Sequence, residues 1–161
     1  MFQNYHNSIR EELIDLGFNI TYSDLNRPWG AFFYIDESQS QFFSDYFFEG
    51  LNIDQLRIDG KLSPKILIVK PDTRLSWQYH NRRAEIWQVY KGSVGVVQSQ
   101  NDEEGNMKIH NPGDQIRINK GIRHRLVGLK DFGVVAEIWQ HTDPVSSDED
   151  DIIRIQDDFG R

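Results

Sequence analysis

The sequence predicts a mainly β fold, a single antiparallel β-sandwich or barrel, and two observations lead to it. From residue 65 onward, short apolar runs rich in Val, Ile and Leu recur at close spacing. Clusters of Asn, Asp, Pro and Gly separate these runs, as at residues 101–105 and 111–114. Because no helical periodicity lies between the runs, they predict short strands joined by turns, which is typical of antiparallel sandwiches and barrels.

The composition narrows the class of protein further. A chain of 161 residues is most simply one domain with a core of its own. Its formal net charge of −7 argues against a nucleic-acid partner, which needs a basic surface. No apolar run approaches the ~20 residues of a membrane helix, and no apolar secretory segment is found, so no membrane partner is expected. The absence of cysteine excludes thiolate metal sites and favours a cytoplasmic location.

The chain is expected to have an N-terminal extension, 1–64, that packs on a barrel domain, 65–161. Within the extension, a short strand is expected at 31–35, and the aromatic stretch at 37–60 predicts a helical insertion. The acidic segment that begins at residue 143 has the composition of a disordered end, but apolar residues follow it. The last residues are therefore expected to dock on the barrel.

A short amphipathic helix is expected at 7–17, ahead of the first strand. Ser8 and Glu11 have the spacing of a capping box, and Gly17 fits the left-handed position that ends many helices. The barrel domain is expected to hold strands near residues 65–70, 74–80, 85–90, 93–99, 106–110, 115–118, 122–127 and 133–141.

Four residues of the barrel domain have the spacing of a metal site. Gln78 and His80 lie two residues apart on one strand, so their side chains point the same way. Glu85 begins the next strand, and His124 lies in a second block of the same form, a strand, a glycine turn and a strand. Two imidazoles, a carboxylate and an amide oxygen suit one divalent metal, Zn first, with Mn, Fe, Co or Ni also compatible. The alternative is that Gln78 and Glu85 only hydrogen-bond His80 inside a polar barrel.

Basic residues surround these predicted ligands. Residues 74–92 and 117–125 together hold eight of the 18 Lys and Arg but only one of the 25 acidic residues, Glu85. This distribution favours an anionic small-molecule substrate, and solvated strand edges are the alternative.

Strand parity assigns some of the polar side chains to the predicted cavity. Arg74 and Ser76 share the face of His80, and Arg83 shares the face of Glu85. Guanidinium groups suit phosphate or carboxylate, so Arg74, Ser76 and Arg83 are predicted to bind the substrate. Ordinary salt bridges are the alternative for both arginines.

The opposite faces of the same strands carry bulky or charged side chains. Arg123 and Arg125 flank the second histidine and are expected to point away from the cavity. Leu75, Trp77 and Tyr79 are expected to face away as well, and such apolar groups need a cover. The N-terminal extension or a second subunit would supply it, so a homodimer is expected.

These motifs resemble the two cupin motifs, written here as Gln78-x-His80-x4-Glu85-x6-Gly92 and Gly113-x5-Asn119-x-Gly121-x2-His124, with Gln78 in place of the first histidine. More narrowly, the chain resembles the cupin-type (type II) mannose-6-phosphate isomerase family, through residues 27–30, 74–80, 83–87, 121–126 and 149–161. The resemblance implies a jelly-roll cupin barrel with one metal. The chain departs from the family pattern at Asn81, Arg82 and Ile86, where histidines are common.

The resemblance implies a metal-dependent aldose–ketose isomerase that interconverts mannose-6-phosphate and fructose-6-phosphate, or a related phosphosugar. Arg83 and Glu85 are the catalytic candidates: Arg83 to stabilise developing negative charge, and Glu85 as a base if it does not bind the metal. Lys70 is another candidate base. The missing histidines favour an alternative, a non-catalytic sugar- or metabolite-binding cupin that retains the metal pocket. A third is an oxygenase, which would need redox-active iron.

Overall fold

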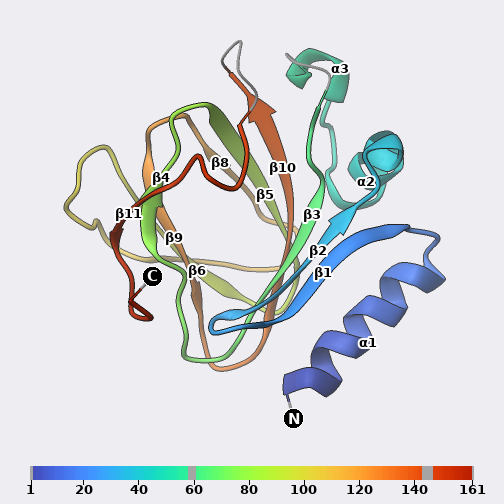
Figure 1. Ribbon diagram of the computed structural model, residues 1–161, viewed down its shortest axis with the longest axis horizontal. Helices are drawn as coiled ribbons and strands as arrows, with labels where there is room; N and C mark the ends of the chain where they lie inside the picture. Colours follow the sequence, from blue (N-terminus) through green and yellow to red (C-terminus); the bar gives the residue numbers. More distant parts are fainter. Residues whose placement is uncertain (1, 58–60, 143–146, 161) are drawn as a thin grey trace.

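A computed structural model describes residues 2–57, 61–142 and 147–160 of the protein. Two antiparallel sheets pack face to face, so the predicted mainly β barrel is confirmed (Figure 1). No helix among these residues is long and apolar enough to cross a membrane. In chain order the elements are α1 (Phe2–Asp15), β1 (Ile20–Arg27), β2 (Gly30–Ile35), the 3-10 helix η1 (Glu37–Gln39), α2 (Ser40–Phe47), α3 (Ile53–Leu56), β3 (Lys65–Val69), β4 (Trp77–Tyr79), β5 (Arg83–Lys91), β6 (Val94–Ser99), β7 (Lys108–His110), β8 (Gln115–Ile118), β9 (Arg123–Gly128), β10 (Gly133–His141) and β11 (Ile153–Gln156).

The larger sheet has six strands in the order β1-β2-β3-β10-β5-β8, and the smaller sheet has five in the order β11-β4-β9-β6-β7. Every strand expected in the barrel domain is present, although β4 is shorter than predicted. β1 and β11 were not predicted. Both are edge strands without a buried apolar run, since β1 is half-buried to exposed and all four residues of β11 are exposed.

The central strands of the larger sheet are buried on both faces, as β3 shows. Leu67 and Val69 point toward the smaller sheet, into a core that includes Trp87. Ile66 and Ile68 alternate with them and pack under the N-terminal helices on the other face. Strands covered on both faces need apolar residues at every position, which explains the continuous apolar run of β3.

The turn from β5 to β6 carries the chain from the larger sheet to the smaller one. Gly92 has a φ of +66° there, a conformation that residues with a Cβ atom rarely adopt. A Cβ atom on Gly92 would lie 2.2 Å from the carbonyl oxygen of Phe132. The glycine is therefore required by both conformation and space.

The first helix begins earlier than predicted and ends at Asp15, with Gly17 in the predicted terminating position. Ser8 is not a cap, because α1 already contains it and its hydroxyl donates to the carbonyl of Tyr5, 2.8 Å away. At the other end Gly17 adopts a φ of +101°. The amide of Phe18 donates to the carbonyl of Leu13 at 3.0 Å, which completes a Schellman motif.

The aromatic stretch at 37–60 contains η1, α2 and α3, so its predicted helical character is confirmed outside residues 58–60, which lie beyond the described part of the chain. Phe43 and Phe47 of α2 are buried, and both rings contact Phe18. Together with α1, these helices cover the outer face of the larger sheet (Figure 1). Residues 1–64 also supply β1 and β2, which belong to that sheet.

The C-terminal tail lies on the smaller sheet. β11 pairs with β4, so that Ile153 faces Tyr79 and Arg154 faces Gln78. The start of the acidic segment, residues 143–146, lies outside the described residues. Ser147 and Asp151 are buried, which brings the end of this acidic segment against the barrel.

The apolar side chains expected to need a cover find it within this chain. The indole of Trp77 is buried and donates to the carbonyl of Asp102 at 2.8 Å. The guanidinium of Arg123 stacks on the ring of Tyr79, 3.8 Å from its centre. Leu75 lines the pocket described below, contrary to the expected outward position. These contacts bury Trp77 and cover Leu75 and Tyr79 in part.

Candidate metal centre

Three of the four predicted metal ligands meet between the two sheets. His80 directly follows β4, Glu85 lies in β5 and His124 lies in β9. Oε1 of Glu85 is 3.4 Å from Nε2 of His80 and 3.0 Å from Nε2 of His124. All three side chains are buried, and their potential ligand atoms lie within 4.8 Å of one another.

Each imidazole makes a hydrogen bond through Nδ1, the ring nitrogen that points away from Glu85. Nδ1 of His80 lies 2.7 Å from the carbonyl oxygen of Asp151, and Nδ1 of His124 lies 2.9 Å from that of Ile122. Because a carbonyl oxygen only accepts, each Nδ1 carries a proton, and in the neutral form of each imidazole Nε2 keeps a lone pair for a metal. Within the described residues, Oε1 of Glu85 and Nε2 of His124 are buried without a hydrogen-bond partner. This donor set therefore fits a divalent metal, which would satisfy both atoms.

Gln78 lies at the edge of the cluster, opposite His124 in the pairing of β4 and β9. Its amide oxygen accepts a hydrogen bond from Ser76, and its amide nitrogen lies 3.4 Å from Nε2 of His80. A half-turn of the amide would exchange the two atoms, and the Ser76 hydroxyl, which can also accept, would still be satisfied. In that rotamer Gln78 offers an oxygen to the cluster.

The protonation states also suit metal binding. Burial lowers the pKa of His80, and the Glu85 carboxylate opposes this shift in part. Burial by itself would raise the pKa of Glu85, but the interactions with His80, Arg83 and His124 outweigh it and hold that pKa well below its usual value. A neutral imidazole at His80 and an ionised carboxylate at Glu85 are the forms in which these two groups bind metals.

Arg83 is buried beside the cluster. Its Nε donates to Oε2 of Glu85 at 3.3 Å, and its Nη2 lies 3.3 Å from Nε2 of His80. The remaining donor group, Nη1, bonds Oγ of Ser147 and the carbonyl of Asp148. Arg83 thus ties two candidate ligands to the C-terminal tail, and it also lines the pocket.

Arg74 lies outside the pocket, contrary to the position that strand parity predicted. Its guanidinium makes two hydrogen bonds to Asp158, at 2.6 and 2.9 Å. Regular strand geometry begins only at Trp77, so the alternation of faces does not extend back to Arg74. Arg74 is therefore not a lining residue of this pocket, and its contact with substrate stays a prediction. Ser76 is buried and donates to Gln78, so it supports a candidate ligand rather than lining the pocket.

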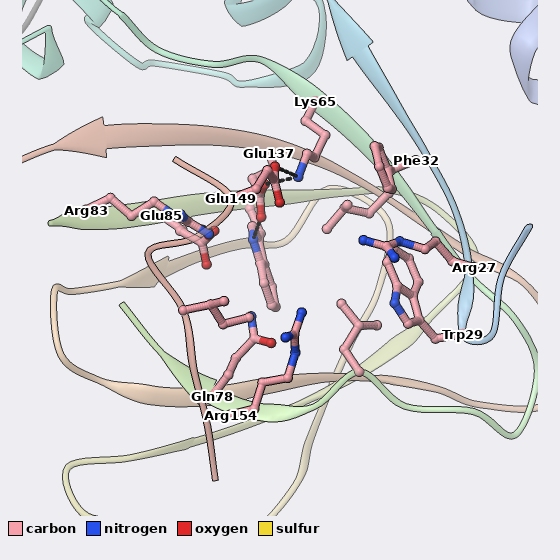
Figure 2. Close-up of a pocket in the computed structure, with 14 residues that line it drawn as sticks. Arg27, Trp29, Phe32, Lys65, Gln78, Arg83, Glu85, Glu137, Glu149 and Arg154 are labelled. Carbon is pink, nitrogen blue, oxygen red and sulfur yellow. Dashed lines mark hydrogen bonds and ion pairs between the residues drawn. The ribbon is translucent and has the colours of Figure 1, made fainter. Parts of the chain in front are cut away.

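A pocket opens beside the cluster, with an inner cavity of about 70 Å³ (Figure 2). Gln78, Arg83 and Glu85 form one part of its wall. The wall also holds residues that sequence reasoning missed, namely Arg27, Trp29, Phe32, Lys65, Leu67, Trp87, Glu137, Glu149, Ile152 and Arg154. Figure 2 shows the Glu137, Glu149 and Lys65 side chains gathered on one side of it.

Two arginines lie where the inner cavity opens outward. Arg27 and Arg154 line both the inner cavity and a larger outer hollow of about 570 Å³. Figure 2 shows their guanidinium groups pointing into the pocket from different walls. Nε of Arg27 is buried without a hydrogen-bond partner in the described structure, and it lies 3.7 Å from a carboxylate oxygen of Asp24. Such a donor is available to an anionic ligand.

Asp151 is a further residue that sequence reasoning missed. Its carboxylate accepts the amides of Asn81 and Arg82, at 3.0 and 2.9 Å, and the hydroxyl of Ser147 at 2.6 Å. Its carbonyl oxygen orients His80. The signal was present, because Asp151 belongs to the C-terminal stretch that resembles the family, but that motif does not reveal which strand it will contact.

A barrel of two antiparallel sheets with His and Glu side chains converging between them defines the protein as a cupin. Residues 51–157 match the model of the family described as "Mannose-6-phosphate isomerase C-terminal", and the chain belongs to that family.

The curated relatives that match this chain are much longer proteins. The chain is 26% identical over 144 residues to a mannose-1-phosphate guanylyltransferase of Salmonella montevideo, covering 89% of this chain and 24% of the relative. It is 31% identical over 136 residues to the xanthan biosynthesis protein XanB of Xanthomonas campestris pv. campestris, covering 84% of this chain and 23% of the relative. The chain therefore spans about a quarter of the length of these relatives.

Solved structures with this fold are more distant. A mutant of the Bacillus subtilis oxalate decarboxylase OxdC superposes with a TM-score of 0.59 at 14% identity, over 85% of this chain and 32% of that one. The capsular polysaccharide protein CapF, solved with an inhibitor, superposes with a TM-score of 0.57 at 14% identity, over 86% of this chain and 34% of that one. These similarities establish the cupin fold.

Proposed function

We propose that the protein is a metal-dependent aldose–ketose isomerase that interconverts mannose-6-phosphate and fructose-6-phosphate, or a closely related phosphosugar. The observation that carries this proposal is the buried cluster of His80, Glu85 and His124, whose unpaired acceptor atoms adjoin a pocket lined by arginines. The family to which the chain belongs supports the same substrate class.

The proposed metal is zinc, held by His80, Glu85 and His124 with Gln78 as the fourth ligand. A bound divalent metal would act as a Lewis acid on the oxygens of the sugar, where an enediolate develops during isomerisation. Arg83, which donates to Glu85, adds positive charge to the same region. With Glu85 assigned to the metal, it is not the base of the reaction.

The positions of the three replaced histidines favour an enzyme over a binding protein. Asn81 and Arg82 do not line the pocket, and their backbone amides bond Asp151. Ile86 packs in the core on the outer face of the larger sheet. None of the three side chains is placed to act on a ligand beside the cluster. The departure from the family pattern therefore removes no side chain from the wall of this pocket.

The phosphate of the substrate is proposed to bind Arg27 and Arg154, the two arginines at the mouth of the pocket. Arginine suits phosphate because its planar group donates two parallel hydrogen bonds. With the phosphate at the mouth, the carbonyl end of the open-chain sugar would extend inward, toward Glu85 and His124. This arrangement assigns to Arg27 the anchoring role predicted for Arg74.

The test is turnover of mannose-6-phosphate to fructose-6-phosphate by zinc-loaded protein, with His124→Ala as the metal-site variant. We expect turnover by the unmodified protein and its loss in the variant. Stoichiometric zinc without turnover would contradict this substrate and favour the binding function.

Two further properties are also proposals. A homodimer is expected to be seen by sedimentation at micromolar concentration, and a purely monomeric species would contradict it. The protein is also proposed to act in the cytoplasm, and fractionation of cells that produce it would test this location.

A further inference from the structure

A buried carboxylate faces the pocket and has no part in the metal cluster. Glu137 lies in β10, where it faces Trp87 of β5 across the sheet. It shares the inner face with Val135, while its neighbours Ala136 and Ile138 pack in the outer core. Its side chain is 4% exposed and lines the inner cavity with Gln78 and Glu85, so it is buried yet adjoins the space a ligand would fill.

The bonds to Glu137 hold it in place without neutralising it. Its Oε2 accepts the indole N–H of Trp87 at 2.7 Å, and its Oε1 accepts that of Trp139 at 2.8 Å. The ammonium of Lys65 lies 3.9 Å from Oε1 of Glu137 and is bonded more closely, at 3.0 Å, to Glu149. Two neutral donors fix the orientation of the carboxylate, and each oxygen keeps a lone pair for a ligand.

The groups around Glu137 also favour a protonatable carboxylate. Burial, reinforced by the negative charge of Glu85, raises its pKa to about 7, and Lys65, Arg83 and the Trp87 indole oppose the shift only in part. A group that is half protonated near neutral pH can both accept and return a proton.

The other candidate bases are less suited than Glu137 to accept a proton from a ligand in the pocket. Glu85 belongs to the metal cluster, where its oxygens contact both imidazoles and Arg83. Lys70 does not line the pocket. Glu149 is half-exposed, and its Oε1 already accepts the Tyr34 hydroxyl and the Lys65 ammonium, at 2.7 and 3.0 Å.

We propose that Glu137 is the catalytic base that moves a proton between C2 and C1 of the bound open-chain phosphosugar. This assignment rests on the proposed isomerase function and adds the group that the metal ligands do not supply.

The step balances without any added reactant. Ionised Glu137 takes the proton from C2 of the aldose, and the C–H electron pair forms the C1=C2 double bond of an enediolate with the negative charge on O1. The proton of O2 moves to O1, C2=O forms, and C1 takes the proton back from Glu137. The ketose and the ionised carboxylate result, and nothing is oxidised or reduced overall.

The experiment compares the zinc-loaded unmodified protein with Glu137→Gln, Glu137→Asp and the control Glu104→Gln, which removes a carboxylate outside the pocket that pairs with Arg125. Each is incubated with mannose-6-phosphate in D2O, and turnover, deuterium at C2 and C1, and zinc content are measured. We expect Glu137→Gln to retain zinc and lose ~10²–10⁴-fold in turnover and in deuterium exchange, the usual contribution of a general base. The Asp variant should retain part of both with a shifted pH profile, and the control should stay within about twofold of the unmodified protein.

The outcomes separate the two proposals. Turnover and exchange by Glu137→Gln at the unmodified rate, with the unmodified protein active, would overturn the role of Glu137 alone. An unmodified protein that binds zinc but neither turns over nor exchanges deuterium would overturn the isomerase function, and the base with it. Loss of zinc in both Glu137 variants would show a structural role for this carboxylate and would also overturn the assignment.

Discussion

Nδ1 of His80 lies 2.7 Å from the carbonyl oxygen of Asp151, so the C-terminal tail fixes the tautomer of a candidate metal ligand 71 residues earlier. The side chain of Asp151 secures this contact, because it accepts both backbone amides of the turn that follows His80. A bond from the far nitrogen of a ligating histidine orients the ring and increases its basicity. The tail is therefore part of the candidate metal centre.

Removing that anchor should weaken metal binding. In Asp151→Ala the two turn amides and the Ser147 hydroxyl lose their acceptor, so His80 loses its fixed orientation. We expect zinc affinity to fall ~10–100-fold, as is usual when the supporting partner of a ligating histidine is removed. Competition with a chromophoric chelator measures this. Asp150→Ala, which removes an exposed neighbour, is the matched control and should bind zinc like the unmodified protein.

Zinc should also stabilise the fold, because it would satisfy the buried atoms of Glu85 and His124 that lack partners. At zinc concentrations 100 times the Kd the gain is about 2.7 kcal/mol, which corresponds to roughly 5–10 °C in Tm for a chain of this size. His124→Ala should lose this shift, whereas His110→Ala, outside the cluster, should retain it. Scanning calorimetry with and without zinc measures the shift of Tm in each variant. Equal shifts in His124→Ala and His110→Ala would contradict a metal site at His124.

The strands and the spacing of the metal ligands could be predicted because both are local patterns. Gln78 and His80 are two residues apart, and that separation alone assigns them to one face of a strand. The same parity failed at Arg74, since it was applied to residues before the regular strand begins at Trp77. Local rules hold only where the local geometry is regular.

Contacts between distant segments could not be predicted in this way. Arg27 and Arg154 reach the pocket from opposite ends of the chain, and no spacing rule relates them. Glu137 left a faint signal, since it is the single acid in the otherwise apolar run Val134–Trp139. A buried position for a lone carboxylate indicates function, but the cavity it faces depends on how the two sheets pack.

Glu137 should make stability depend on pH. Its pKa is raised from 4.5 to about 7 by burial, so the folded state holds the proton more tightly than the unfolded state does. Its contribution is therefore fully present below about pH 4.5 and is lost as the pH rises to about 7. The free energy of unfolding of the metal-free protein, minus that of Glu137→Gln, should fall over this range. Urea titrations at several pH values measure the difference, and a constant or rising difference would contradict the raised pKa.

Arg27 lines the pocket, whereas Arg74, which strand parity predicted to lie there, does not. Arg27→Gln should raise KM for mannose-6-phosphate ~10–100-fold with a smaller effect on kcat, because a charged hydrogen bond contributes about 1.5–3 kcal/mol. Arg74→Gln is the matched control. It breaks a pair with Asp158 on the surface, so KM should stay within about twofold. Initial rates over a range of substrate concentrations give both constants. The reverse pattern, with KM raised only by Arg74→Gln, would move the phosphate to the position that strand parity predicted and away from the mouth of the pocket.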